Sequence, residues 1–263
     1  MVDTTGEPDL VDTWRRAAEA RLTGWDFSAL DGRVHEEQPP WSYEVLAATA
    51  LAGARDVLDM GTGGGEKLME LLRVSGHLPD HVVATEGWPP NLPVARANLA
   101  GHGIGVVAYD AETDRAMPFP GASFDVVLNR HEAYVAAQVH RVLRPGGVFV
   151  TQQVDGRDFE ESTRIFGTPQ EYLHVNLADL RDEAEAAGLV VESAQEWSGT
   201  TAFTDVAALV HYFALVPWQA PADFTVDGYL DILLALHREG PAVGRPVTFT
   251  SRRFHLVARR PRP

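Results

Sequence analysis

Four glycines follow a short apolar run in the segment Leu58–Glu66, LDMGTGGGE. Glycine lets a backbone turn sharply and approach a ligand closely, so this segment is a candidate ligand loop. A phosphate, a dinucleotide and a nucleoside without phosphate are all candidate ligands. A phosphate-binding P-loop needs Lys and then Ser or Thr after its last glycine, whereas Glu66, Lys67 and Leu68 follow here. The P-loop interpretation therefore fails.

The loop also departs from the dinucleotide fingerprint GxGxxG. Counting from Gly61, the place of the third glycine is taken by Glu66. A carboxylate suits the positive end of a helix dipole, but it would repel a pyrophosphate at the same place. Asp59, two residues before Gly61, adds a second negative charge. The loop is better suited to a ligand that carries positive charge.

Two more carboxylates end the next two predicted strands. Glu86 ends HVVATE, 25 residues after Gly61, where a carboxylate can accept hydrogen bonds from both hydroxyls of a ribose. Asp110 ends GVVAYD, where it can accept a hydrogen bond from an exocyclic amine such as adenine N6. In this order, at successive strand ends, the acidic residues describe a pocket for an adenosine with a cationic tail.

These residues need a parallel sheet to bring them together. Predicted strands (DVLDM, HVVATE, GVVAYD, FDVVLN and VFVTQQV) alternate with helices, the last of them EAYVAAQVHRVL, between residues 56 and 154. This alternation predicts right-handed crossovers, with helices covering both faces of the sheet. A helix (LADLRDEAEAAG), a strand (LVVESAQEW) and helical stretches over 204–216 and 226–239 follow. The final segment, VTFTSRRFHLVARR, is expected to pair antiparallel at an edge.

Five segments resemble the class I S-adenosylmethionine (SAM) dependent methyltransferases: VLDMGTGGG, VVATEG, VVAYDAE, MPFPGASFDVVLNR and HRVLRPGGVFVTQQ. The FDVV strand, then a helix and LRPGG, is typical of the methyltransferase-11-like group. DMGTGGGE, TEGWPPN and NRHEAY resemble one bacterial subgroup of it. The resemblance implies an α/β fold with a Rossmann-like, seven-stranded, mostly parallel sheet whose last strand is antiparallel. It also implies SAM as cofactor and S-adenosylhomocysteine as product.

By this resemblance, the cofactor would meet the glycine loop first, and Glu86 would hold its ribose. The expected cofactor-binding residues are Asp59, Met60, Gly61, Thr62, Gly63, Glu86, Gly87, Asp110, Ala111 and Asn129, the last through its backbone. Glu86 departs from the family pattern, which more commonly has Asp at this position.

The segment NRHEAY follows the fourth strand, which in this fold lies beside the cofactor. His131 has a suitable pKa range for a general base, and Glu132 is expected to orient it or to act itself. In the alternative interpretation, Glu132 sits in the first turn of a helix and His131 caps a loop. Arg130 either neutralises Glu86 or Asp110 or grips an anionic substrate. An Asn-Pro-Pro-Tyr motif is absent, which disfavours amide and exocyclic amine acceptors.

Two additions to the sheet are expected to select the substrate. Residues 1–48 form an N-terminal helical cap in which Ser42 is an N-cap, and 49–263 form the methyltransferase domain. Within that domain, an insertion over about 203–240 is a candidate substrate lid. Aromatic walls with a few polar groups suit a small organic acceptor, and the candidate acceptor contacts are Trp41, Tyr43, Arg130, His211 and Trp218. Trp25 belongs to the same aromatic set.

Composition excludes several functions. The chain has 263 residues and no cysteine, and its histidines lack metal-binding spacing, so no metal is expected. A net charge of −15 would repel nucleic acids. The N-terminus lacks the basic and apolar stretches of a signal peptide, and no run reaches the ~18 apolar residues of a membrane span. We expect a cytoplasmic monomer or homodimer without membrane contact.

The sequence thus predicts a SAM-dependent methyltransferase for a small organic molecule. The alternatives are an RNA or protein methyltransferase and a non-catalytic SAM-binding module. An NAD-dependent oxidoreductase is disfavoured because Glu66 replaces the third glycine.

Overall fold

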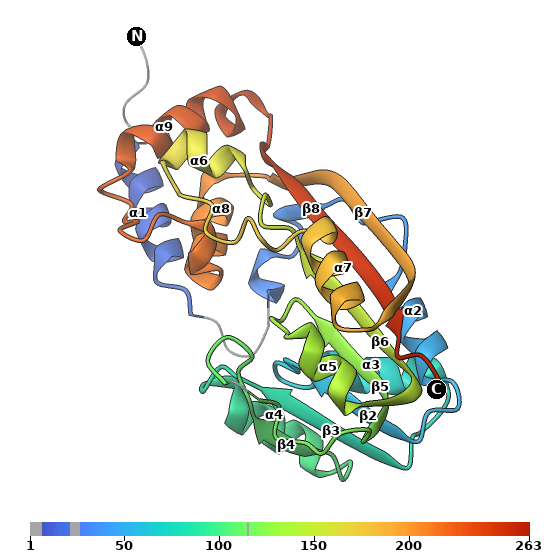
Figure 1. The fold of residues 1–263 in the computed structure, drawn as a ribbon. Coiled ribbons are helices and arrows are strands. Elements are labelled where there is room, and N and C mark those ends of the chain that lie inside the picture. Colours follow the sequence, from blue (N-terminus) through green and yellow to red (C-terminus); the bar gives the residue numbers. More distant parts are fainter. Residues whose placement is uncertain (1–6, 22–26, 115) are drawn as a thin grey trace. The chain divides into compact units, whose positions relative to one another are not determined.

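The computed structural model describes residues 7–21, 27–114 and 116–263 (Figure 1). Trp25 therefore lies outside the described residues. Of the helices in these ranges, none combines the length and the apolar character needed to cross a membrane. The chain divides into two compact units. The first unit comprises the described residues of Met1–Gln38, Arg157–Glu171 and Ser198–Arg252, and the second comprises Pro39–Gly156, Tyr172–Trp197 and Arg253–Pro263.

Eight strands in the described residues form one sheet in the order β1-β7-β8-β6-β5-β2-β3-β4. They are β1 (Val34–Glu36), β2 (Asp56–Met60), β3 (His81–Glu86), β4 (Gly105–Ala108), β5 (Phe124–Arg130), β6 (Leu143–Val154), β7 (Val190–Phe203) and β8 (Val247–Arg259). Strands β4, β3, β2, β5 and β6 pair in parallel, and β8 pairs antiparallel with β6. The mostly parallel sheet with an antiparallel last strand is confirmed, but β8 lies between β7 and β6, so the expected edge position of this strand was wrong. The eighth strand is β1, which is three residues long and pairs with β7. It is too short for an alternation of apolar and polar residues to be recognised in the sequence.

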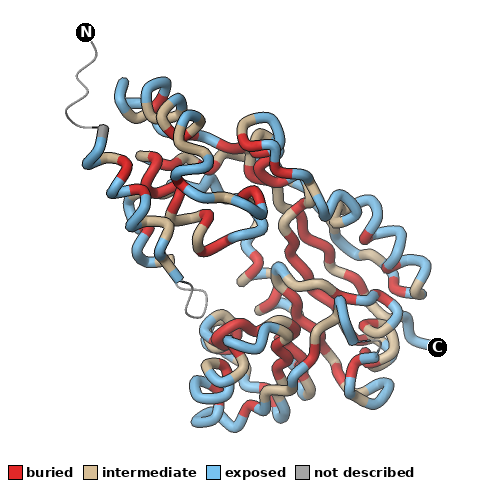
Figure 2. The backbone as a smooth tube through the Cα atoms, turned by 90° about the vertical axis from the view of Figure 1, so that its left-hand side faces the viewer, coloured by how far each residue is buried: buried red, intermediate tan, exposed pale blue. Residues whose placement is uncertain are grey.

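Helices cover both faces of the parallel strands in the second unit. One apolar cluster joins α2 (Tyr43–Leu51), α3 (Glu66–Ser75) and α4 (Asn91–Ala100) to one face, through residues such as Val57. The other joins α5 (Ala136–Val142) and α7 (Leu177–Ala186) to the opposite face, through residues such as Leu58 and Phe149. Because Val57 and Leu58 are both fully buried, the middle of strand β2 is a continuous apolar run. Figure 2 shows buried backbone, in red, running through the interior of the molecule.

Two local expectations fall in this unit. Ser42 caps α2 as predicted, because its Oγ accepts a hydrogen bond from the Val45 amide at 3.2 Å. The predicted helix EAYVAAQVHRVL begins only at Ala136, so placing Glu132 in a first helical turn was wrong. His131 has a left-handed backbone with φ of 59°, and the chain reaches Val135 in an extended conformation before α5 starts.

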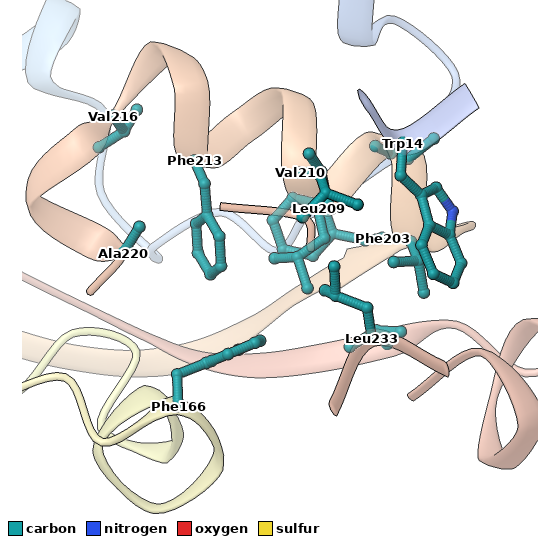
Figure 3. Packing of buried hydrophobic residues seen from close by; sticks show 14 of the residues in the cluster. Trp14, Phe166, Phe203, Leu209, Val210, Phe213, Val216, Ala220 and Leu233 are labelled. Atoms are coloured by element: carbon teal, nitrogen blue, oxygen red, sulfur yellow. The ribbon is translucent and has the colours of Figure 1, made fainter. Parts of the chain in front are cut away.

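The first unit has its own apolar core. Its helices in the described ranges are α1 (Glu7–Ala18), η1 (Ser28–Leu30), α6 (Glu161–Phe166), α8 (Val206–Leu215), η2 (Pro217–Gln219), α9 (Leu230–Glu239) and η3 (Pro241–Val243). Trp14, Phe213 and Leu233 meet in this core (Figure 3). The N-terminal helix α1 thus shares one core with the insertion 203–240, whereas α2 belongs to the second unit. That this insertion acts as a substrate lid stays a prediction.

Substitution of Phe149 tests the packing that stabilises the parallel strands. Its ring is fully buried and meets Tyr134 edge-on at 4.8 Å between centroids. We expect Phe149→Ala to lower the free energy of unfolding by about 3–5 kcal/mol, through lost burial and the cavity left behind. Val74→Ala, at a 44% exposed position of α3, should change it by less than about 0.5 kcal/mol. Urea unfolding measures both, and equal effects would contradict this account of the core.

Candidate active site at the ends of the parallel strands

The glycine loop connects β2 to α3 in a backbone shape that only glycine adopts readily. Gly61, Gly63 and Gly65 have φ of 63°, 63° and 90°. Gly65 precedes the first turn of α3, and a Cβ on it would lie 2.8 Å from Leu99 Cγ. The Thr62 amide donates to the Thr85 carbonyl at 2.9 Å, which attaches the loop to β3. The spacing of the glycines therefore follows from this path of the chain.

Glu86 joins the end of β3 to the glycine loop. Its side chain is buried, and its Oε2 accepts a hydrogen bond from the Gly63 amide at 2.7 Å. Its Oε1 accepts one from the Trp88 amide, also at 2.7 Å. Burial raises the pKa of Glu86, while these amides oppose the shift. The sequence grouped Glu86 and the loop in one expected pocket, and the structure brings the two into direct contact.

Asp110 lies against the same strand end. A Cβ on Gly87 would come within 3.0 Å of Asp110 Cβ, so the two segments touch. Strand β4 ends at Ala108, and Asp110 begins the turn after it. Its carboxylate accepts hydrogen bonds from the Glu112 amide at 2.9 Å and the Thr113 hydroxyl at 3.1 Å. Asp110 therefore holds its own turn in shape, with Ala111 half-buried beside it.

Glu132 packs directly on the glycine loop. A Cβ on Gly61 would collide with the Glu132 side chain. Desolvation raises the pKa of Glu132 to about 7, and the charges of Glu86 and Asp110 add to the shift. Glu132 thus lies next to Gly61, one of the predicted cofactor-binding residues.

Asp59 and Asn129 complete the group from the central strands. Asp59 is buried beside Met60, and desolvation followed by the charge of Glu86 raises its pKa to about 7. Asn129 pairs with Met60 across the sheet, and its Oδ1 accepts a hydrogen bond from Gln153 Nε2 at 2.6 Å. Asn129 Nδ2 is buried and without a hydrogen-bond partner.

Two buried carboxyl groups, Asp59 and Glu86, and the half-buried Glu132 lie around the loop without cationic partners among the described residues. Asp59, Glu86 and Glu132 form ion pairs with none of the Lys, Arg or His side chains in the described part of the chain. Buried negative charges without partners are unfavourable, which is why two of these groups have a pKa near neutrality. A cationic ligand would relieve this cost. Over the same residues, no group of three or more His, Asp or Glu side chains is placed to hold a metal ion.

Contacts with Gln152 hold His131 near the end of β6. Its backbone amide donates to the Gln152 carbonyl at 2.8 Å, and its ring Nε2 lies 3.3 Å from Gln152 Nε2. Trp41 donates its indole N–H to Gln152 Oε1 at 2.8 Å, and its ring packs on His255 at 4.7 Å between centroids. The His131 pKa lies well below its usual value, because protein surrounds the ring and Arg130 and Arg253 repel a further positive charge, although part of the residue is solvent-exposed.

Arg130, the last residue of β5, stands apart from the acidic group. It pairs with neither Glu86 nor Asp110, so the expectation that it neutralises one of them was wrong. Its Nε is buried and has no hydrogen-bond partner.

The other predicted acceptor contacts are distributed over both units. Tyr43 is buried at the start of α2, and its hydroxyl has no hydrogen-bond partner. Desolvation, followed by the charge of Asp59, raises the Tyr43 pKa well above its usual value. His211, on α8, and Trp218, on η2, belong to the first unit. Their contact with an acceptor stays a prediction.

Sequence reasoning missed Gln152 and His255 as neighbours of the site. The signal for Gln152 was available, because two glutamines end the buried apolar run of β6 at the same edge of the sheet as Asn129. His255 lies on β8, more than a hundred residues further along, and only strand pairing places it opposite Gln152.

Gly61 and Gly76 form a matched pair for testing the loop. Both have φ of 63°, but a Cβ on Gly76 meets nothing within 4 Å, whereas one on Gly61 meets Glu132. Each Ala variant should lose about 1–2 kcal/mol of stability to the left-handed backbone. Only Gly61→Ala should also lose the rise in melting temperature caused by S-adenosylhomocysteine. A normal rise in Gly61→Ala would show that this loop does not contact the ligand.

Comparison with known proteins agrees with this geometry. A family model described as "Methyltransferase domain" matches residues 58–151, from β2 into β6. The ubiquinone biosynthesis O-methyltransferase of Sinorhizobium fredii is 29% identical over 159 residues, which are 54% of this chain and 62% of that protein. The uncharacterized methyltransferase YodH of Bacillus subtilis is 29% identical over 42% of this chain and 48% of its own length. The chain thus spans about half the length of these curated relatives.

Among solved structures, the YcgJ protein of Bacillus subtilis has the same fold. Its TM-score is 0.57 at 17% identity, covering 84% of this chain and 98% of that one. The matched segment includes the glycine loop, Glu86, Asp110 and Asn129. Residues 58–151 therefore match a methyltransferase domain, and the chain shares its fold with YcgJ.

Proposed function

We propose that this protein transfers a methyl group from SAM to a small organic acceptor. The observation that supports this best is the set of three carboxyl groups around the glycine loop, two buried and one half-buried, which have no cationic partner among the described residues. SAM carries a sulfonium and an ammonium group and so suits this charge. When bound, it supplies an electrophilic methyl group. S-adenosylhomocysteine, the product, lacks the sulfonium charge.

The residues around the loop fit an adenosine with a cationic tail. Glu86 already accepts two backbone hydrogen bonds, which orient its carboxylate while leaving lone pairs for ribose hydroxyls. We assign the adenine edge to Asp110 and Ala111, and the methionine part to Asp59, the Gly61–Gly63 backbone and Asn129. NAD suits the site less well, because its pyrophosphate would face the same carboxylates.

Glu132 is the group best placed to take a proton from the acceptor. It touches Gly61, and its pKa of about 7 makes it half ionised at neutral pH. Methyl transfer depends mainly on alignment of the reacting atoms, so a base matters only for an acceptor that must lose a proton. His131, which follows β5 where this strand pairs with β6, is the second titratable group next to Glu132.

A small acceptor fits the charge of the chain and the names of its relatives. The net charge of −15 opposes long-range attraction of RNA or DNA. The Sinorhizobium fredii relative is named for methylation of an oxygen in ubiquinone biosynthesis, which is small-molecule chemistry. We therefore rank methylation of a small molecule above methylation of RNA or protein.

Ligand-dependent melting tests the proposed function. A ligand at about 100 times its dissociation constant stabilises a protein by about 2.7 kcal/mol, and for a domain of this size the melting temperature should rise roughly 5–10 °C. We expect this rise with SAM and with S-adenosylhomocysteine, and none with NAD. In Asp59→Asn the rise with SAM should be much smaller, because a buried negative charge has been removed.

Asp80→Asn is the control, since this carboxylate forms an exposed ion pair with Arg55 at the other end of β3. It should respond to SAM as the wild type does. Absence of any rise with SAM or S-adenosylhomocysteine in ligand-free wild-type protein would refute the proposed function. Transfer of isotope-labelled methyl to a panel of small hydroxy and amino compounds then identifies the acceptor.

The affinity for SAM should depend on pH more steeply than that for S-adenosylhomocysteine. Asp59 and Glu132 have pKa values of about 7, above their usual values, so the free protein keeps protons on them below pH 7. Since a cation favours the ionised forms, binding SAM should release protons. Its affinity should rise from pH 6 to pH 8, by up to about tenfold per pH unit below 7 for each proton released.

Calorimetry in two buffers of different ionisation enthalpy counts the protons released. Glu132→Gln should release up to one proton fewer than the wild type. The same raised pKa values predict that stability of the ligand-free protein declines as pH rises from about 4 through 7, because protonation favours the folded state over that window. Equal pH slopes for SAM and S-adenosylhomocysteine would contradict the electrostatic assignment.

A further inference from the structure

The orientation of the Gln152 amide is determined by Trp41. An indole N–H can only donate, so the Gln152 atom 2.8 Å from Trp41 Nε1 is the amide oxygen. The amide nitrogen of Gln152 therefore faces His131 Nε2, at 3.3 Å. An amide nitrogen also only donates, so His131 Nε2 must be the acceptor and carries no proton. A neutral His131 ring then has its proton on Nδ1.

This arrangement leaves His131 without a free basic nitrogen. Its Nε2 lone pair is occupied by Gln152, and its Nδ1 is an N–H donor. If the ring took up a second proton, on Nε2, two N–H donors would face each other at this contact, which is unfavourable. The positive charges of Arg130 and Arg253 oppose that proton as well. His131 is thus held as a neutral hydrogen-bond donor.

Arg130 supplies a cation next to this donor. Its Nε is buried and lacks a partner, and the guanidinium pairs with no carboxylate in residues 7–21, 27–114 and 116–263. Arg130 and His131 are consecutive, at the end of β5, and the charge of Arg130 reaches the His131 ring. An anionic ligand would supply the hydrogen-bond acceptor that the buried Nε of Arg130 lacks.

We propose that Arg130 and the Nδ1–H of His131 together bind an anionic oxygen of the methyl acceptor, either a carboxylate or a phenolate. This rests on the proposed function, and it names the class of acceptor. Arg130 provides charge and a forked set of donors, and His131 provides one further N–H. His131 then acts as a donor, and Glu132 is the group left to receive a proton. A phenolate acceptor would need no base.

Ring nitrogen-15 NMR tests the state of His131 without turnover. The His131 signals are assigned as those missing from His131→Asn. We expect the neutral ring with Nδ1–H from pH 6 to pH 8. In Gln152→Glu, a carboxylate replaces the donating amide, so the proton should move to Nε2 and the His131 pKa should rise. An Nε2–H ring or an ordinary titration near pH 6.5 in the wild type would overturn the donor role.

Calorimetry on protein saturated with S-adenosylhomocysteine tests the anion site. The matched probes are 4-hydroxybenzoate against 4-hydroxybenzamide for a carboxylate, and 4-nitrophenol against phenol at pH 8 for a phenolate. In at least one pair, the anion should bind about tenfold more tightly or better than its neutral partner. Arg130→Gln should remove this preference, and Arg130→Lys should retain part of it.

S-adenosylhomocysteine binding in the same samples separates the two proposals. If the wild type does not bind it, the proposed function fails. If it binds, but both pairs show no anion preference, no probe binds, or the preference survives in Arg130→Gln, the anion site is refuted. Arg130→Gln is expected to bind S-adenosylhomocysteine as the wild type does, which excludes misfolding as the cause of a lost preference.

Discussion

Burial of both faces of the parallel strands is the constraint on which the rest of the second unit depends. Helices α2, α3 and α4 cover one face and α5 and α7 the other, so most residues in the middle of the strands are apolar. Polar side chains can then gather only where the strands end. The carboxyl ends of neighbouring parallel strands lie along one edge, which brings Asp59, Glu86 and Arg130 into one region although the chain separates them by many residues.

Along this edge of the sheet, acidic and basic side chains lie at the ends of different strands. The β2 and β3 ends carry buried carboxyl groups that no cation among the described residues offsets, and Glu132 reaches over the glycine loop to join them. The end of β5 carries Arg130 instead. An acidic region that suits a cationic cofactor therefore stands beside a basic residue that suits an anionic acceptor. In the proposed function, this separation would keep the two ligands from competing for the same charges.

The His131 ring illustrates how packing determines chemistry at one atom. Trp41 lies before α2, Gln152 lies near the end of β6, and His131 follows β5 in a left-handed conformation. Since the indole can only donate, it orients the amide, and the amide in turn determines which ring nitrogen of His131 is protonated. A histidine that sequence alone assigns as a base is thereby held as a donor.

The sequence by itself determined the order of strands and helices, the antiparallel last strand and the acidic residues that surround the glycine loop. These features are local, because each apolar run, the glycine spacing and each strand-end carboxylate can be recognised within a segment of about ten residues. The sequence did not determine the start of α5, the packing of Glu132 on Gly61 or the fact that Arg130 pairs with no carboxylate in the described residues. Only the tertiary structure decided these, because each depends on which distant side chains burial brings within hydrogen-bond distance.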